Sequence, residues 1–230
     1  MPTLLLRLAG PMQSWGTRSR FDERDTELVP SKSGVIGLIC AAMGVDREER
    51  EPVLELARLR MGVRVDRPGV LRYDYQTAQN VIAADESKIH PTTTSKRYYL
   101  ADAAFLVGLE GEDEALLQKA HRALQNPVWP LYLGRKGYVP SPGIYLKDGL
   151  RQEPLKEALA YWSSDWEWPQ DEEGKPIETL RLPIWLESPS ETGSMRMDQP
   201  LGSFAERRFG ARFVVPDWVE VKHVPEPAPA

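Results

Sequence analysis

A Ser-Lys-Ser triplet, residues 31–33, stands directly before an apolar run that ends at Gly44. The run predicts a buried helix over about 33–43, because glycine suits the left-handed position that closes a helix. The start of a helix presents free backbone N–H groups and the positive end of the helix dipole. With the hydroxyls of Ser31 and Ser33 and the amine of Lys32 added, this start is suited to bind phosphate. Nucleic acid is therefore the first ligand to test.

Two loops supply further candidates. The first loop carries Gln13, Ser14 and Trp15 between two glycines, directly after an apolar strand pattern. The amide of Gln13 could read a base edge or a ribose, whereas the Trp15 indole either packs in the core or stacks on a base. The second loop places Arg135 and Lys136 between glycines, where the backbone can approach a phosphate closely. A surface turn with solvated cations is the alternative for this second loop.

The charge of the chain is distributed unevenly. The 230 residues carry a net charge of −5, but residues 1–100 hold 15 Lys and Arg against 13 Asp and Glu, while residues 151–230 hold 9 against 15. The first part can therefore attract a polyanion although the whole chain is acidic. Arg20 stands in a run where arginines alternate with acidic residues, so ion pairs or solvation are the alternative there. The acidic last third fits either solvated surface or a basic protein partner.

Composition excludes several other classes. Cys40 is the single cysteine, so no disulfide framework exists and a cytoplasmic protein is expected. No apolar run reaches about 18 residues, and the N-terminus lacks a signal-peptide cleavage region, so no membrane association is expected. The three histidines are scattered, so neither a metal site nor a cofactor is predicted.

The hydrophobic pattern predicts a mixed α+β fold. Strands are expected at about 3–8, 61–66, 103–109 and 128–133, and helices at about 33–43, 47–58 and 112–124. In chain order, leaving aside the charged helix at 47–58, these elements run strand, helix, strand, strand, helix, strand. That is the order of a ferredoxin-like or RNA-recognition-motif (RRM-like) fold.

Two further parts complete the predicted organisation. The connection over about 68–100 is too long for an ordinary loop, and its flanks are rich in Thr and Tyr, which favours a projecting β-hairpin. The last third is rich in Pro and Trp and has short strand patterns at 179–186 and 212–215. We therefore expect an RRM-like domain over residues 1–140 and a small β-rich subdomain over 141–230 with a disordered tail.

Five motifs carry a family resemblance. They are L-R-L-A-G-P-M-Q-S-W-G (residues 6–16), S-K-S-G-V-I-G-L (31–38), D-Y-Q-T (74–77), K-R-Y-Y-L-A-D-A-A-F (96–105) and Y-L-G-R-K-G (132–137). In this order they resemble the CasD family of type I-E CRISPR interference complexes (Cascade), which belongs to the RAMP superfamily. The resemblance covers residues 3–146 well and the last third only loosely.

The resemblance implies a non-catalytic, RNA-binding subunit. Such a subunit has an RRM-like domain with a hairpin called the thumb, and it caps the 5′ handle of the CRISPR RNA. It also contacts the backbone subunit and the large subunit, and it meets target DNA only through the assembled complex. The hairpin, at about residues 72–100, would wedge against the RNA where the handle meets the guide and would contact the neighbouring backbone subunit.

The motifs and nearby cations give the predicted RNA-binding set. Its members are Gln13, Ser14, Trp15, Arg20, Ser31, Lys32, Ser33, Lys96, Arg97, Arg135 and Lys136.

Two other functions stay open at the level of sequence. Some relatives in other CRISPR types are metal-independent endoribonucleases that cut repeat RNA with a general base, a general acid and cations. Here the possible participants are His90, Lys96, Tyr98 and Lys136, although no histidine falls within the shared motifs. A purely structural interaction module without RNA contact is the third reading, and the acidic last third favours it.

Overall fold

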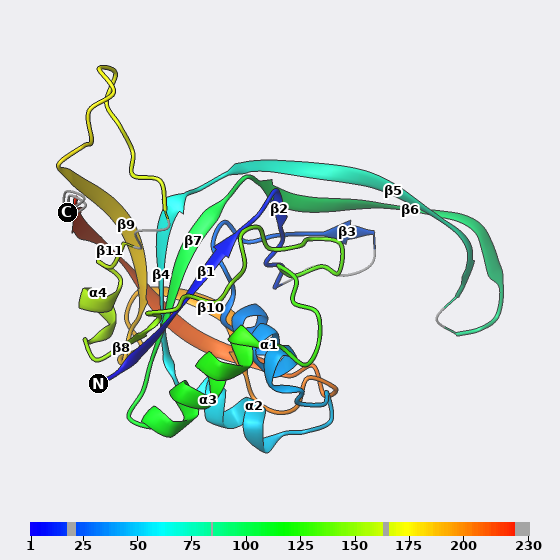
Figure 1. Ribbon diagram of the computed structural model, residues 1–230. Helices are drawn as coiled ribbons and strands as arrows, with labels where there is room; N and C mark the ends of the chain where they lie inside the picture. Colours follow the sequence, from blue (N-terminus) through cyan, green and yellow to red (C-terminus); the bar gives the residue numbers. More distant parts are fainter. Residues whose placement is uncertain (18–21, 84, 163–165, 224–230) are drawn as a thin grey trace.

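The computed structural model describes residues 1–17, 22–83, 85–162 and 166–223, and it has an α+β fold (Figure 1). The strands are β1 (Thr3–Ala9), β2 (Met12–Gln13), β3 (Glu23–Arg24), β4 (Arg60–Arg67), β5 (Val70–Ile82), β6 (Ile89–Ala101), β7 (Ala104–Glu110), β8 (Leu150–Arg151), β9 (Thr179–Glu187), β10 (Ser194–Pro200) and β11 (Phe209–Lys222). The helices are α1 (Lys32–Met43), α2 (Glu51–Ala57), α3 (Glu114–Gln125) and α4 (Leu155–Ala158). Among the described residues, no helix is both long enough and apolar enough to cross a bilayer.

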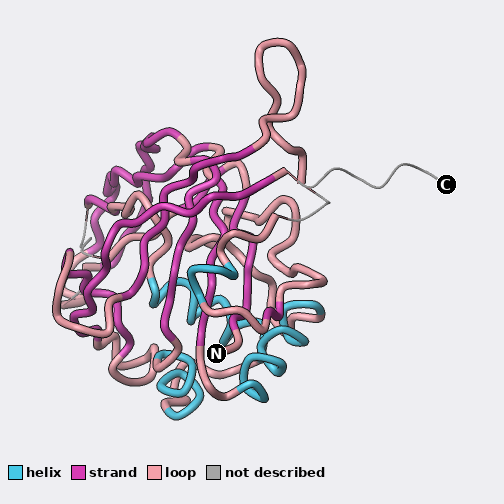
Figure 2. Tube along the Cα trace, turned by 90° about the vertical axis from the view of Figure 1, so that its left-hand side faces the viewer, coloured by secondary structure: helices cyan, strands magenta, loops and turns pink. Residues whose placement is uncertain are grey.

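The main sheet has seven strands in the order β10-β11-β9-β4-β7-β1-β8, and every pairing in it is antiparallel. Strand β1 is buried on both faces, which explains its almost unbroken apolar sequence. Leu4, Leu6 and Leu8 face one side, where α1, α2 and α3 pack (Figures 1 and 2). Leu5 faces the other side, which α4 and a group of tryptophans cover. The sheet thus separates two apolar cores.

Helix α1 lies within one residue of its predicted bounds. Ser31, just before the helix, has an extended backbone, and Gly44, just after it, has the left-handed conformation with φ of 73°. The helix is apolar nearly all round because it packs against the sheet, α2, α3 and β10. The charged helix predicted at 47–58 is shorter in the structure, because Pro52 sets the start of α2 in its first turn.

Strands β5 and β6 form a long antiparallel hairpin that projects from the body of the protein (Figure 1). Its side chains are mostly exposed, and the rings of Tyr73 and Tyr98 pack across the two strands with centroids 5.7 Å apart. At its base, β6 also pairs with β2 and, in parallel, with β3. The hairpin is therefore anchored in a small second sheet of four strands.

The segment 128–133 is not a strand, contrary to expectation. The backbone N–H groups of Val128 and Trp129 donate to the carbonyls of Ala42 and Ala41, at the end of α1. This capping of α1 holds the segment away from the sheet, and the position beside β1 is taken by β8. Strands β9 to β11 extend the main sheet through the pairing of β9 with β4. The division into two domains at residue 140 stays a prediction.

Candidate functional site

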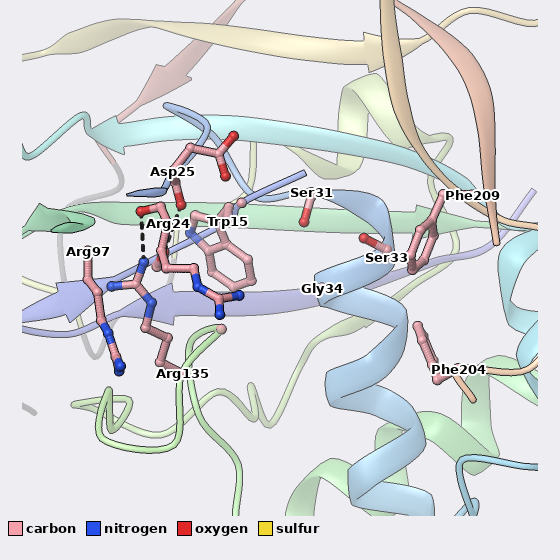
Figure 3. Close-up of a pocket in the computed structure, with 13 residues that line it drawn as sticks. Trp15, Arg24, Asp25, Ser31, Ser33, Gly34, Arg97, Arg135, Phe204 and Phe209 are labelled. Atoms are coloured by element: carbon pink, nitrogen blue, oxygen red, sulfur yellow. Dashed lines mark hydrogen bonds between the residues drawn. The ribbon is translucent and has the colours of Figure 1, made fainter. Parts of the chain in front are cut away.

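A cavity of about 440 Å³, named here the arginine cavity, opens where the first loop, the start of α1 and the loop after α3 meet (Figure 3). Its lining residues are Ser14, Trp15, Gly16, Arg24, Asp25, Ser31, Ser33, Gly34, Arg97, Gly134, Arg135, Phe204 and Phe209. Six of the eleven predicted residues line it: Ser14, Trp15, Ser31, Ser33, Arg97 and Arg135. Segments that lie far apart in the sequence therefore build one site.

Three guanidinium groups line one end of the cavity. Arg135 donates to the Tyr138 hydroxyl at 2.9 Å and to the backbone oxygen of Arg24 at 3.2 Å, and Arg97 donates to the Ser95 hydroxyl at 3.2 Å. These acceptors are all neutral. Among the described residues, no carboxylate pairs with Arg24, Arg97 or Arg135. Asp25 is the single acidic residue in the described lining, so positive charge dominates this end and favours an anion.

Ser14 ties the loops of the cavity together. Its backbone N–H donates to Leu133 O at 3.1 Å, and its hydroxyl donates to Tyr98 O at 3.2 Å. Gly134 has a φ of 89°, and a Cβ on it would lie 1.8 Å from the carbonyl oxygen of Ser14. Only glycine fits there, since both the backbone conformation and the space exclude a side chain. This close approach places Arg135 at the cavity.

Gln13 and Trp15 are part of the scaffold. The Gln13 amide donates to Leu8 O at 3.1 Å and to Ala103 O at 2.7 Å, and its oxygen accepts from the Trp15 indole at 3.2 Å. Both side chains are buried, with exposures of 0% and 1%. The structure corrects the expectation that Gln13 reads a base, because the amide is buried and its hydrogen-bonding groups have partners inside the protein. The Trp15 indole packs in the core, which was one of its two expected roles, although part of it lines the cavity.

The structure also corrects the expected role of Lys32. Its ammonium is 1% exposed and donates to both carboxylate oxygens of Glu187, at 2.9 and 3.0 Å. Its backbone N–H donates to Asp198 at 2.7 Å, so a carboxylate of the chain itself sits at the start of α1. Arg212 binds the same Asp198 through two contacts of 2.6 and 2.9 Å. Burial lowers the pKa of Lys32, and the attraction of Glu187 opposes that shift.

The remaining predicted residues lie around the cavity or beyond it. Ser31 and Ser33 line it from the helix start, and neither hydroxyl has a hydrogen bond to a described residue. Lys96 and Lys136 are exposed and do not belong to the described lining. Arg20 lies outside the described residues, so its predicted contact stays a prediction.

Seven of the thirteen lining residues lie outside the predicted set, and three of them, Arg24, Phe204 and Phe209, could contact a ligand through a cationic or aromatic side chain. Arg24 looked like one more charge in an alternating run, and only the parallel pairing of β3 with β6 sets it beside Arg97. Phe204 lies in the loop between β10 and β11, and Phe209 is the first residue of β11; both lie at the end of the cavity opposite the arginines (Figure 3). No local pattern marked them, because their place depends on the fold of the last third.

The histidines considered for catalysis lie elsewhere. His90 is on β6 near the tip of the hairpin, His121 contacts Leu146 O at 2.8 Å from α3, and the His223 ring lies 5.1 Å from that of Trp168. None of the three lines the cavity as described. The described residues also contain no group of His, Cys, Asp and Glu suited to hold a metal ion.

Comparisons with known proteins agree on one family. The model of a family described as CRISPR-associated protein (Cas_Cas5) matches residues 3–215. The CRISPR system Cascade subunit CasD of Escherichia coli (strain K12) is 33% identical over 174 residues, which cover 69% of this chain and 76% of that protein.

Two solved structures are similar over nearly the whole chain. One, described as a crystal structure of a Cas protein, has a TM-score of 0.76 and 52% identity, covering 99% of this chain and 100% of that one. The other, described as a CRISPR RNA-guided surveillance complex, has a TM-score of 0.77 and 34% identity, covering 96% of this chain and 91% of that one.

Proposed function

Because the chain belongs to the Cas5 family of CRISPR-associated proteins, to which CasD-type subunits belong, we propose that it is a non-catalytic CRISPR RNA-binding subunit of a type I-E Cascade complex. In this proposal it caps the 5′ handle of the RNA in the cytoplasm. The names of its relatives support the assignment, since one is a Cascade subunit and another belongs to an RNA-guided surveillance complex.

The arginine cavity is the observation that carries the proposal. Three guanidinium groups that pair with no carboxylate of the described residues suit the phosphates of an RNA backbone, and the hydroxyls of Ser31 and Ser33 can add hydrogen bonds to phosphate or ribose. We assign phosphate contact to Arg24, Arg97 and Arg135. Exposed cations near the cavity, such as Lys96 and Lys136, add attraction at longer range.

The fold supports the finer part of the assignment. Strands β8, β1, β7 and β4 are neighbours in that order, with α1 and α3 on one face, as in a ferredoxin-like or RRM-like domain. We propose that the β5–β6 hairpin is the thumb, which lies against the RNA and contacts the neighbouring backbone subunit. The large subunit would contact another face, and target DNA would be met only through the complex.

Salt-dependent binding of repeat RNA by the full-length protein tests the cavity. Arg97→Ala and Arg135→Ala should each weaken binding and lower the slope of log affinity against log salt by about 0.7, the value for one phosphate contact to a single strand. Arg181→Ala, which removes an exposed arginine on β9, is the matched control and should leave the slope unchanged. Slopes equal to wild type in both cavity variants would show that the RNA binds elsewhere.

Two further measurements test the other parts. Incubation of the purified protein with repeat RNA in EDTA should give no specific cleavage, and a specific product would establish the endoribonuclease alternative. Replacement of residues 77–94 by a short turn should leave the protein folded, because the described residues of this range pair as strands only with each other. Assembly with the other subunits should then fail, and normal assembly would exclude the thumb role.

A further inference from the structure

A second cavity, of about 830 Å³, adjoins the arginine cavity and is named here the apolar cavity. The two cavities share Gly16, Ser33, Gly34, Gly134, Phe204 and Phe209. They therefore form one continuous hollow along α1, with the arginines at one end. Each cavity falls within the range of volumes that small molecules occupy in proteins.

The walls of the apolar cavity are aromatic and aliphatic. One wall is the face of α1 that carries Gly37, Leu38 and Ala41, and another is the segment 129–132. The Trp129 side chain is 39% exposed although its backbone N–H is fixed to Ala41 O at 3.2 Å, so an indole is held at the rim. Asp46, Arg47 and Arg207 supply the charges of the lining.

Gly37 keeps the apolar cavity open. A Cβ at this position would lie 3.5 Å from the ring of Phe204, at ordinary contact distance. A longer side chain there would extend into the space between α1 and Phe204. Gly37 does not line the arginine cavity, so the two halves of the hollow can be altered separately.

The division of the hollow matches the division of a nucleotide. A phosphate is anionic and suits the guanidinium end, whereas a base is flat, largely apolar on its faces and stacks on aromatic side chains. An apolar side chain of a protein partner would gain nothing from the arginines, and a free phosphate would gain nothing from the aromatic wall. Because the two cavities are continuous, they favour one ligand that has both an anionic part and a flat aromatic part.

We infer that the apolar cavity holds an unpaired base of the same RNA strand whose phosphate lies in the arginine cavity. This inference rests on the proposed function and adds a base-binding chamber to it. The base stacks against aromatic side chains of the lining, among which are Phe204 and Trp129, while Arg97 and Arg135 hold the adjoining phosphate. Because a π-face is common to all bases, stacking sets the position of the strand rather than its sequence.

Fluorescence of 2-aminopurine tests the chamber, because stacking quenches this base. Short single-stranded RNAs of the CRISPR repeat, each with 2-aminopurine at one position, are titrated with the full-length protein. We expect strong quenching at one position. Gly37→Leu should abolish that quenching and weaken binding about tenfold, a typical loss for one stacked base, without changing the salt slope. Gly37→Ala is the matched control for side-chain size, because its Cβ only reaches contact distance of Phe204, and it should keep the quenching and the RNA affinity of wild type. Trp129→Ala tests another wall of the cavity by an exposed substitution.

The outcomes separate the two proposals. In one outcome, Arg97→Ala lowers the salt slope of RNA binding, but Gly37→Leu and Trp129→Ala still quench 2-aminopurine as strongly as wild type. The proposal of RNA binding then stands, and the base-binding chamber is excluded. If these two variants lose complex assembly while RNA binding and quenching are unchanged, the apolar cavity holds a protein partner and the inference is overturned. If the wild-type protein binds none of the RNAs, both proposals fail together. Thermal unfolding of each variant shows which of them remain folded.

Discussion

The ammonium of Lys32, in the first turn of α1, lies 2.9 Å from the carboxylate of Glu187 at the end of β9, 155 residues later in the chain. The same carboxylate accepts the backbone N–H of Met61 at 3.1 Å, and the Arg212 guanidinium lies 3.8 Å from it. Glu187 therefore joins α1, β4 and β11 beneath the helix start. A lysine that the sequence suggested for a ligand instead fixes the last third of the chain to the first.

Substitutions of Lys32 and of Glu187 should lower the free energy of unfolding by different amounts. Glu187→Met leaves the buried ammonium of Lys32 without its carboxylate, and such a loss costs about 3–5 kcal/mol. Lys32→Met should cost less, because Glu187 keeps Arg212 and the Met61 N–H as partners. The double variant should be more stable than Glu187→Met alone. Urea denaturation of the three variants measures these differences, and additive losses would show that the pair is not coupled.

Stability should also rise with pH in an alkaline window that Lys32 sets. Burial lowers the pKa of Lys32 below its ordinary value of 10.5, so the unfolded chain holds this proton more tightly than the folded one. Between the lowered pKa and 10.5, folding releases the proton, and the cost of burying the charge fades as pH rises. Wild type should therefore gain stability relative to Lys32→Met on going from neutral pH to pH 10. A difference independent of pH would mean that Lys32 titrates as it does in water.

Two glycines of the same helix should give opposite results. A Cβ at position 34 would lie 2.9 Å from the ring of buried Trp15, whereas at position 37 it meets only ordinary contacts. Gly37→Ala should raise the free energy of unfolding by about 0.5–1 kcal/mol through helix propensity. Gly34→Ala should lower it and disturb the fluorescence of Trp15. Equal effects at both positions, measured by thermal unfolding, would contradict the packing of Trp15 against α1.

Cys40 should be inert in the folded protein. It is 3% exposed, and burial, assisted by the charge of Glu49, raises the pKa of its thiol to about 12. The thiolate that reacts with alkylating reagents is therefore nearly absent at pH 8. We expect slow labelling in buffer and rapid labelling in urea, measured by mass spectrometry. Fast labelling of the native protein would show that α1 opens readily.

Gly134→Ala should separate RNA binding from stability. The added Cβ cannot coexist with the Ser14 carbonyl, so the loop must move and carry Arg135 away from the arginine cavity. RNA affinity should fall at least as far as in Arg135→Ala. Gly137→Ala is the control in the same loop, because a Cβ there meets nothing within 4 Å. Equal affinities of the two glycine variants would place Arg135 outside the binding site.

Features set by local sequence were predictable, and features set by distant pairing were not. The bounds of α1 followed from its apolar run and the glycine at its end, and the Thr- and Tyr-rich flanks indicated the strands of the hairpin. The partners of Lys32 and the position of Phe204 depend on β9 to β11, which lie more than 140 residues away in sequence. The loop at 128–133 looked like a strand because its sequence is apolar, but the backbone N–H groups of Val128 and Trp129 donate to the end of α1 instead of to a sheet.

The hairpin has a mechanical consequence. Strand β6 pairs with β3 at Lys96 and Arg97, and beyond that point, among the described residues, it pairs with β5 alone. A ribbon of two strands flexes and twists more easily than the wider sheet at its root. The more flexible two-stranded part of the hairpin therefore begins next to Arg97. A force applied to the outer part of the β5–β6 hairpin, for example by a bound subunit, would therefore reach Arg97. Such a force would change how the arginine cavity holds its ligand.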